Sequence, residues 1–404
     1  MTFSLREPAV VRHGALTVLH DLQPGPLTAI AVAVRAGSRC DGGHPGLAHM
    51  TEHMLFQGTH TLDQAALNRR AGELGGEHDA DTGYEDMTIH LEILTEEVED
   101  ALALIADQLF RSRLSADRFR KERRVVIDEI RGRQEDPANY LHERAWGRFF
   151  GGPLAHPVCG TIASVRRMTP AAVRGFVARH FVPANMVVAV VGGVSRTRLQ
   201  RALARTFPRS GPPARRHPPL GRRTTTGLLR LRRHDLTQAY LVRLIASPRD
   251  ARRLLALALA VEIMGADPDA RLFQEVRERL GLGYDVSATV EQGRDWAVTV
   301  LAASTARDDE GRLRTTVERT CTEAARGFTV EELERARKKI RLRLMRLARS
   351  PLDQAIAHAT RRAAGHPSLA ATTRLLAGIA HGEVEAAWRV ALAAPTLTAV
   401  LSAA

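Results

Sequence analysis

The sequence has little lysine, few aromatic residues and few cysteines, and each shortage excludes a class of protein. Lysine occurs only at Lys121, Lys338 and Lys339, so the net charge of +13 comes almost entirely from arginine spread over the chain. Aromatic residues make up 4% of the chain, too few for the stacking platforms that bind single-stranded nucleic acid. We therefore attribute the charge to a compositional preference for arginine and expect no nucleic acid as a partner.

Disulfides and membrane spans are also not expected. The three cysteines, Cys40, Cys159 and Cys321, are scattered and show no Cys-x-x-Cys spacing, which suits a reducing compartment. The N-terminus has no basic region followed by an apolar core, as a signal peptide would. The longest apolar runs, such as 254–261 and 186–191, are far too short to span a bilayer. We expect a cytoplasmic protein without a membrane partner.

The length of 404 residues and the hydrophobic content of 44% predict a globular protein of two or more domains. Between Pro208 and Pro219 the sequence is too rich in proline for a helix or a central strand, which indicates a linker. We expect a first domain over 1–207, a Pro- and Arg-rich linker over 208–224 and a second domain over 225–404.

The order of predicted elements recurs after the linker. In the first half, strands over 9–22, 27–36 and 84–94 accompany helices over 47–55, 62–74, 97–110 and 115–135. In the second half, strands over 238–246, 284–290 and 296–302 accompany helices over 251–264, 270–280, 311–325 and 329–348. The pattern predicts an α+β fold built from two similar units that form an internal repeat.

The chain is organised around a short apolar helix that follows the glycine- and proline-broken loop at 43–46. On this helix His49, Glu52 and His53 stand at positions i, i+3 and i+4, on one side. Two imidazoles one turn apart can occupy adjacent positions around zinc, and the glutamate then lies beside a bound water. In a chain with 16 histidines the pattern also arises by chance, so a third ligand is needed.

Two carboxylates of the long helix at 115–135 are candidates for that ligand. Glu122 and Glu129 lie two turns apart on one face, next to the apolar Val126 and Ile130. A carboxylate on a buried face needs a cation, and zinc with two neutral histidines has room for an anion. Two solvated acids in an arginine-rich helix explain the same spacing equally well. The helix of the second repeat at 251–264 contains no histidine, so a metal site belongs to the first repeat.

With these residues the chain resembles the insulinase/pitrilysin-type inverzincin metallopeptidases, in the branch typified by mitochondrial processing peptidase and its bacterial relatives. That family combines His-x-x-Glu-His with a zinc-binding glutamate about 76 residues further on, and here 129 − 53 = 76. Further matches are the stretch 52–59, with Gln57 where lysine is common, together with Gly160-Thr161, Thr169-Pro170 and 182–192. The resemblance implies Zn²⁺ bound by His49, His53 and Glu129, with Glu52 as general base.

The resemblance also implies roles for residues that their surroundings in the sequence leave ambiguous. The stretch 271–284 is similar to the family's arginine/tyrosine signature, which implies that Arg277 and Tyr284 hold and polarise the scissile carbonyl. Glu122 is then a candidate for orienting the zinc ligands. Asp79 and Ala80 stand where the family usually has Asn-Ala in a substrate-pairing edge strand, and an aspartate cannot donate as an amide does.

In the family the arginine/tyrosine pair acts across a clamshell of two such halves. The resemblance therefore implies a zinc endopeptidase that hydrolyses peptides or unfolded segments in a chamber formed by two chains. The second chain is either an identical copy or a paralogue. Two alternatives stay open: a dedicated processing peptidase for leader peptides, for example of a biosynthetic precursor, and a non-catalytic scaffolding subunit of the same family.

Overall fold

The computed structural model describes the chain except for residues 1–4, 77, 222–223, 266 and 284. Contacts divide the chain into two compact units, each assembled from three segments. Unit 1 contains 1–131, 156–219 and 344–371, and unit 2 contains 132–155, 220–343 and 372–404. In the part of the chain described, no helix is both long and apolar enough to cross a membrane.

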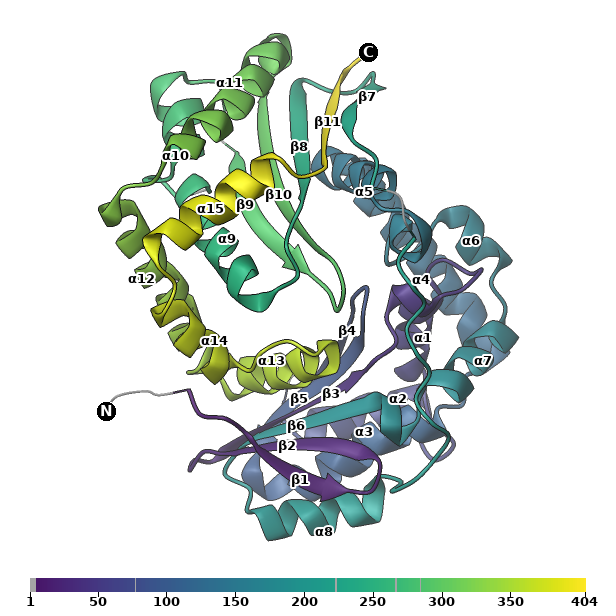
Figure 1. The fold of residues 1–404 in the computed structure, drawn as a ribbon. Helices are drawn as coiled ribbons and strands as arrows, with labels where there is room; N and C mark the ends of the chain where they lie inside the picture. Colours follow the sequence, from purple (N-terminus) through teal and green to yellow (C-terminus); the bar gives the residue numbers. More distant parts are fainter. Residues whose placement is uncertain (1–4, 77, 222–223, 266, 284) are drawn as a thin grey trace. The chain divides into compact units, whose positions relative to one another are not determined.

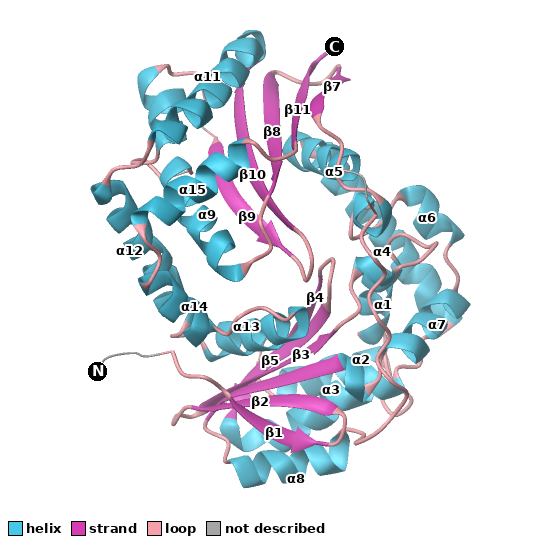
Figure 2. Ribbon diagram, viewed as in Figure 1, coloured by secondary structure: helices cyan, strands magenta, loops and turns pink. Residues whose placement is uncertain are grey.

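Unit 1 is a six-stranded sheet with helices on both faces (Figures 1 and 2). Its strand order is β1-β2-β6-β3-β5-β4; β2 and β6 are parallel and the other neighbours antiparallel. The strands are β1 (Ala9–His13), β2 (Leu16–Leu22), β3 (Leu27–Val34), β4 (His78–Thr82), β5 (Met87–Leu94) and β6 (Met186–Gly192). The helices of the first half are α1 (Leu47–Leu55), α2 (Gln64–Glu73), α3 (Val98–Arg111), α4 (Ala116–Glu135), α5 (Pro137–Phe149), α6 (Ile162–Arg167), α7 (Pro170–His180) and α8 (Arg196–Thr206).

Alternation along the strands separates two cores in unit 1. One face carries large side chains, such as Ile30, Val32 and Ile89, which pack beneath α1, α3, α4, α7 and α8. The other face carries alanines, among them Ala31 and Ala189, and is covered by α13 (Pro351–Ala364) through further alanines of its own. Because small residues meet small residues there, α13 lies close to the sheet. The strand between these cores, β3, is buried on both sides, as its continuous apolar run predicts.

Unit 2 repeats the sheet of unit 1 with one strand fewer. Its order is β7-β11-β8-β10-β9, again with a single parallel pair, β7 and β11. The strands are β7 (Gly227–Arg233), β8 (Gln238–Ala246), β9 (Val286–Gln292), β10 (Ala297–Ala306) and β11 (Thr396–Ala403). The other helices of the second half are α9 (Ala251–Met264), α10 (Arg271–Phe273), α11 (Glu310–Glu323), α12 (Val330–Leu347), α14 (Leu369–Ala377) and α15 (His381–Leu392).

The repeat predicted from the sequence is therefore present, and the α+β fold class is confirmed. Strands β2, β6, β3, β5 and β4 correspond in order and direction to β7, β11, β8, β10 and β9. Each long helix is followed by a helix that packs on a sheet of the opposite half of the sequence: α5 packs on β8 and β11, and α13 on β3 and β6. The predicted division at 207 and 224 is untested as a domain boundary and stays a prediction.

One predicted helix differs in form. The single helix expected over 270–280 is a short α-helical turn, α10, followed by a π-helical segment at Gln274–Arg279. The wider spacing is visible in the hydrogen bond from Leu280 N to Glu275 O, 3.2 Å long, which spans five residues. Hydrophobic periodicity does not predict the π-helical segment, because one inserted residue shifts the helical register only locally. The elements predicted from the sequence end at residue 348, and the structure adds α13, α14, α15 and β11 beyond it.

Candidate metal centre

Helix α1 begins where the backbone turns sharply at Gly46. Gly46 has φ 90°, and a Cβ there would lie 2.5 Å from Cys159 O, so only glycine fits. The buried carboxylate of Asp41 accepts hydrogen bonds from Gly46 N at 2.6 Å and Ala48 N at 2.7 Å. These bonds satisfy backbone donors at the start of the helix, where a negative charge is favourable. The loop before α1 therefore sets the direction of the helix.

The two histidines lie on the partly exposed side of α1. The opposite side is buried and carries Leu47, Met50, Thr51 and Met54, as the helical periodicity predicts. The rings of His49 and His53 are one turn apart, with centroids separated by 4.7 Å and planes inclined at 68°. Their side chains are 13% and 19% exposed, so both are held by packing and both still reach solvent.

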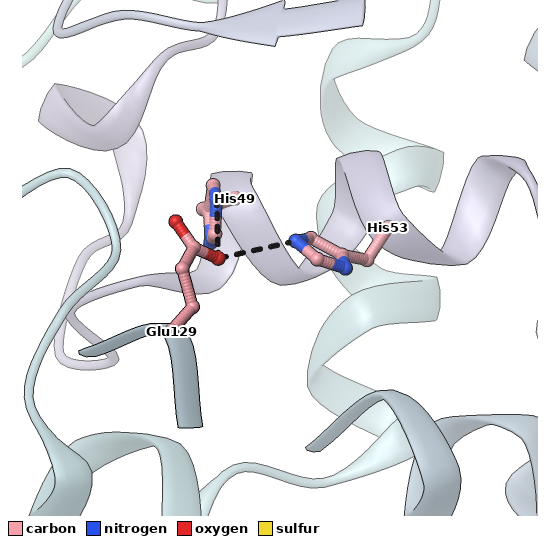
Figure 3. A group of neighbouring side chains, drawn as sticks. All are labelled: His49, His53 and Glu129. Carbon is pink, nitrogen blue, oxygen red and sulfur yellow. Dashed lines mark ion pairs between the residues drawn. The ribbon is translucent and has the colours of Figure 1, made fainter. Parts of the chain in front are cut away.

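Helix α4 presents two glutamates to these rings. Glu129 Oε2 lies 3.5 Å from His49 Nε2 and 3.6 Å from His53 Nε2, and Figure 3 shows its carboxylate pointing toward both rings. Glu122 Oε2 lies 3.1 Å from the other nitrogen of His53, Nδ1. The buried residues Phe119, Val126 and Ile130 fix the inner face of α4, so both acids reach the histidines of α1, Glu122 with a side chain 13% exposed and Glu129 with one 38% exposed. The structure thus brings together His49, His53, Glu122 and Glu129.

The donor set fits a zinc ion. One ligand atom each from His49, His53 and Glu129 lies within 4.8 Å of the others. Two imidazoles and one carboxylate, with a position left for water, is the ligand set of catalytic zinc sites. Burial is the largest influence on His53 and lowers its pKa, but the hydrogen bonds that the ring donates to Glu122 and Glu129, together with nearby negative charges, outweigh it and raise the pKa to about 9. The negative charges that stabilise a proton on His53 also stabilise a metal cation bound beside this ring.

Glu52 lies between the two histidines along α1 and has its own partner. The hydroxyl of Thr82, at the end of β4, donates a hydrogen bond to Glu52 Oε2. Burial raises the pKa of Glu52 to about 7, while the Thr82 hydrogen bond and the neighbouring His53 act in the opposite direction. A carboxylate with a pKa near 7 accepts and returns protons readily at neutral pH.

Strand β4 forms one edge of the unit 1 sheet, with β5 as its only neighbour among the strands described. Asp79 is exposed, and its carboxylate accepts a hydrogen bond from the adjacent Ala80 N at 2.8 Å. Ala80 is buried on the face that also carries Thr82. The edge strand is therefore placed beside α1, with Asp79 pointing to the other face of the sheet.

Arg277 lies in unit 2, within the π-helical segment. Its guanidinium carbon is 4.9 Å from the centroid of the Phe273 ring, and its side chain is 36% exposed. The predicted partner Tyr284 lies outside the described residues.

Sequence reasoning did not identify Thr82 or Asp41. Thr82 stands two residues after Ala80, which in a strand places both side chains on one face, and this spacing could have indicated it. Asp41 lies five residues before the N-cap residue Gly46, outside the position at which the helix-capping preference would identify an aspartate. The local sequence pattern reveals neither contact. Glu52 is distant from Thr82 along the chain, and Asp41 lies in an irregular loop.

Comparison with known proteins gives matches over most of the chain. Residues 16–161 match the family profile described as "Insulinase (Peptidase family M16)", and residues 167–340 match the one described as "Peptidase M16 inactive domain". An uncharacterized zinc protease of Mycobacterium leprae is 32% identical over 302 residues, covering 72% of this chain and 67% of the relative. An uncharacterized zinc protease of Rickettsia bellii is 28% identical over 340 residues, covering 83% of this chain and 82% of the relative.

The fold has close counterparts among solved structures. The crystal structure of a peptidase M16 inactive domain from Pseudomonas fluorescens superimposes with a TM-score of 0.91 at 21% identity and covers 98% of both chains. The first repeat, which carries both histidines, matches the insulinase profile, and the histidine-free helix α9 falls in the part that matches the inactive-domain profile. On the sequence matches and the identity to the mycobacterial relative, the chain belongs to the insulinase family of peptidases, peptidase family M16.

Proposed function

We propose that this protein is a zinc-dependent endopeptidase that hydrolyses peptides or unfolded segments. The observation that carries the proposal is the convergence of His49, His53 and Glu129 from two helices, with ligand atoms within 4.8 Å of one another. The zinc protease names of the relatives support the same metal and the same class of reaction.

His49 Nε2, His53 Nε2 and a Glu129 oxygen would hold the ion. Glu122 accepts a hydrogen bond from His53 Nδ1–H, which would leave the Nε2 lone pair for the ion that Nε2 and Glu129 both face. When bound, zinc lowers the pKa of a coordinated water to about 7 and polarises a carbonyl group.

Glu52 is the general base of the proposed reaction. One of its oxygens accepts from Thr82, so the second oxygen is available for the proton of the attacking water. Glu52 later delivers that proton to the nitrogen of the leaving amine, which cannot depart as an anion. Partial burial keeps the carboxylate from being fully solvated, which suits proton transfer in both directions at neutral pH.

The substrate would add to the sheet as a further strand along β4. An edge strand offers unpaired backbone groups to an extended peptide, and this mode requires an unfolded segment. The Asp79 carboxylate already accepts from Ala80 N and has no proton to donate to a peptide carbonyl, so recognition at this position depends on the backbone.

Arg277 and Tyr284 would complete the site from a second chain and stabilise the negative oxygen that develops on the scissile carbonyl. Because one chain carries both the zinc-binding motif and this pair, a homodimer is self-sufficient, and a heterodimer with a paralogue is the alternative. A cytoplasmic location stays a prediction.

The test combines metal analysis with a cleavage profile. Wild-type protein is analysed for zinc and incubated with a library of unstructured peptides, and products are identified by mass spectrometry. We expect about one zinc per chain, chelator-sensitive cleavage, and a Glu52→Gln variant that keeps zinc and loses turnover. Glu73→Gln, an exposed glutamate on α2, is the control and keeps full activity.

Three outcomes separate the alternatives. Zinc without cleavage of any peptide would indicate a scaffolding subunit, and cleavage confined to one precursor sequence would indicate a dedicated processing peptidase. Full activity in Glu52→Gln would contradict the role of that carboxylate.

A further inference from the structure

We propose that Thr82 is a positioning residue that orients the Glu52 carboxylate from the strand that receives the substrate. The inference rests on the proposed function and goes beyond it, because it assigns a role to a residue outside the zinc-binding motif. The observation is the hydrogen bond from the Thr82 hydroxyl to Glu52 Oε2, which joins the end of β4 to helix α1.

The hydroxyl is useful for orientation because the hairpin that carries it is held in place. Thr82 pairs with Met87 of β5, and the turn that follows is closed by a 2.8 Å hydrogen bond from Gly83 N to Asp86 O. The turn also accepts two backbone hydrogen bonds from the loop before α1, from Ser38 N to Gly83 O and from Arg39 N to Tyr84 O, both 3.0 Å long.

A buried ion pair fixes the same turn a second time. Arg39 is 1% exposed and donates from Nη1 to Glu85 Oε1 at 3.0 Å. His217 Nδ1 lies 3.3 Å from the second oxygen of Glu85, and Arg39 also donates to Pro218 O at 2.9 Å. Removing one partner of such a pair leaves a charge without compensation, so the pair resists separation. Thr82 is thus attached to a turn that is anchored through backbone and side chains.

The consequence for Glu52 is geometric. A glutamate side chain on a helix surface turns about three single bonds, and only some rotamers aim an oxygen at a water bound beside the histidines. A fixed donor on one oxygen selects among those rotamers and leaves the other oxygen as acceptor. Misplacement of a reacting group by about 1 Å costs on the order of a hundredfold in rate. Thr82 therefore acts through Glu52.

The location on β4 adds a link to substrate binding. The strand that would pair with a peptide also carries the hydroxyl that holds the base, but a peptide would pair with the backbone of the strand and not with this hydroxyl. We therefore expect Thr82 to affect turnover rather than peptide affinity.

The experiment compares Thr82→Val, which keeps the shape and removes the hydroxyl, with Thr82→Ser, which keeps the hydroxyl. The matched control is Thr88→Val on the neighbouring strand β5, where the buried Thr88 hydroxyl has no hydrogen-bond partner in the described structure. The substrate is a quenched fluorogenic peptide that wild type cleaves in the library. The measurements are kcat and KM, zinc content, and the Kd of the metal-free protein for the same peptide.

We expect Thr82→Val to lower kcat about 10- to 100-fold, with KM, zinc content and the metal-free Kd within about twofold of wild type. Thr82→Ser is expected to restore kcat to within a few-fold of wild type, and Thr88→Val to match wild type throughout.

Three results would overturn the positioning role: unchanged kcat in Thr82→Val, an equal loss in Thr82→Ser, or a loss confined to KM and the metal-free Kd. Equal losses in Thr88→Val and Thr82→Val would likewise overturn it, because they would report a general weakening of the hairpin. If wild type cleaves no peptide, the proposed function itself fails and the role of Thr82 falls with it. These failures are distinguishable because the first set requires an active wild type.

Discussion

His53 Nδ1 lies 3.1 Å from Glu122 Oε2, while His53 Nε2 lies 3.6 Å from Glu129 Oε2. The two nitrogens of one ring therefore face two carboxylates that stand seven residues apart on α4. In the neutral, metal-binding form of the ring, Nδ1 would donate to Glu122 and Nε2 would carry the lone pair. Glu122 thus favours the tautomer of His53 that binds a metal through Nε2, and it orients the ring.

Replacing Glu122 by glutamine tests this relationship. The amide oxygen still accepts a hydrogen bond but carries no charge, so Glu122→Gln should weaken zinc binding about 10- to 100-fold. The affinity is measured by competition with a chelator at fixed pH. Asp128→Asn, an exposed acid on the same helix, is the control for the loss of one negative charge and should leave the affinity unchanged. Equal affinities of Glu122→Gln and wild type would contradict the role of Glu122.

Mixing two inactive variants tests whether the second half of the site comes from another chain. Each proposed site combines Glu52 of one chain with Arg277 of the other. In a mixed dimer with one Glu52→Gln chain and one Arg277→Leu chain, one site therefore has both residues mutated and the other has both intact. Random pairing after mixing should therefore recover about a quarter of wild-type activity. Each variant alone is the control and should stay inactive. If activity does not return although mixed dimers form, Arg277 does not act in trans.

Gly37 tests the anchoring of the β4–β5 turn. Its backbone, at φ −85° and ψ −166°, is open to any residue, but a Cβ there would lie 2.3 Å from Gly83 O and 2.6 Å from Tyr84 O. Because only backbone atoms stand in the way, the turn must move. Gly37→Ala should lower the free energy of unfolding by about 1–3 kcal/mol and reduce kcat while zinc stays bound.

The matched control for Gly37→Ala is Gly43→Ala, in the same loop, where a Cβ meets nothing within 4 Å. Chemical denaturation and steady-state kinetics supply the two measurements. If Gly37→Ala and Gly43→Ala have the same free energy of unfolding and the same kcat, the turn accommodates the added Cβ without loss of stability or activity.

We expect His180 to make the stability of the folded protein depend on pH. Burial, together with the positive charges of Arg179 and Arg215, lowers the pKa of His180 to about 4, against about 6.5 in an unfolded chain. Between these values the unfolded chain binds a proton that the folded chain does not, so stability falls as the pH is lowered from about 6.5 to 4. This residue contributes a loss of about 2 kcal/mol at pH 5 relative to pH 8.

The variant His180→Gln should show a smaller decrease in the denaturation midpoint between pH 8 and pH 5 than wild type does. The quantity to compare is the change with pH within each protein, because the substitution also alters stability at every pH. His60→Gln, an exposed histidine, should retain the wild-type decrease. Identical decreases in His180→Gln and wild type would refute the assignment.

Much of the local structure around the site could be predicted from the sequence. Helix α1 with Leu47, Met50 and Met54 on its buried side follows from periodicity, and α4 ends at Glu135 where Asp136 and Pro137 follow. Such features depend on residues within one or two turns of each other, and those residues are also close in the sequence. The repeat was visible for the same reason, since it compares one local pattern with another.

Local sequence patterns did not predict which glutamate of α4 contacts which histidine of α1. Glu122 and Glu129 lie on one face of α4, so their spacing does not distinguish the metal ligand from its neighbour. The prediction that Glu129 is the ligand came from the family resemblance. The structure places Glu129 opposite both Nε2 atoms and Glu122 opposite Nδ1, because the packing of α4 through Val126 and Ile130 sets its height along α1.

The sequence by itself determined most elements up to residue 348, their order, their repetition and the motif on α1, since all of these follow from short-range spacing. Only the tertiary structure decided that Thr82 meets Glu52, that Arg39 and Glu85 lie buried behind the turn, and that α13 covers the alanine face of the first sheet. Those contacts join segments 30 to more than 150 residues apart. Such distances carry no periodic signal, because they depend on how whole layers of the fold pack against each other.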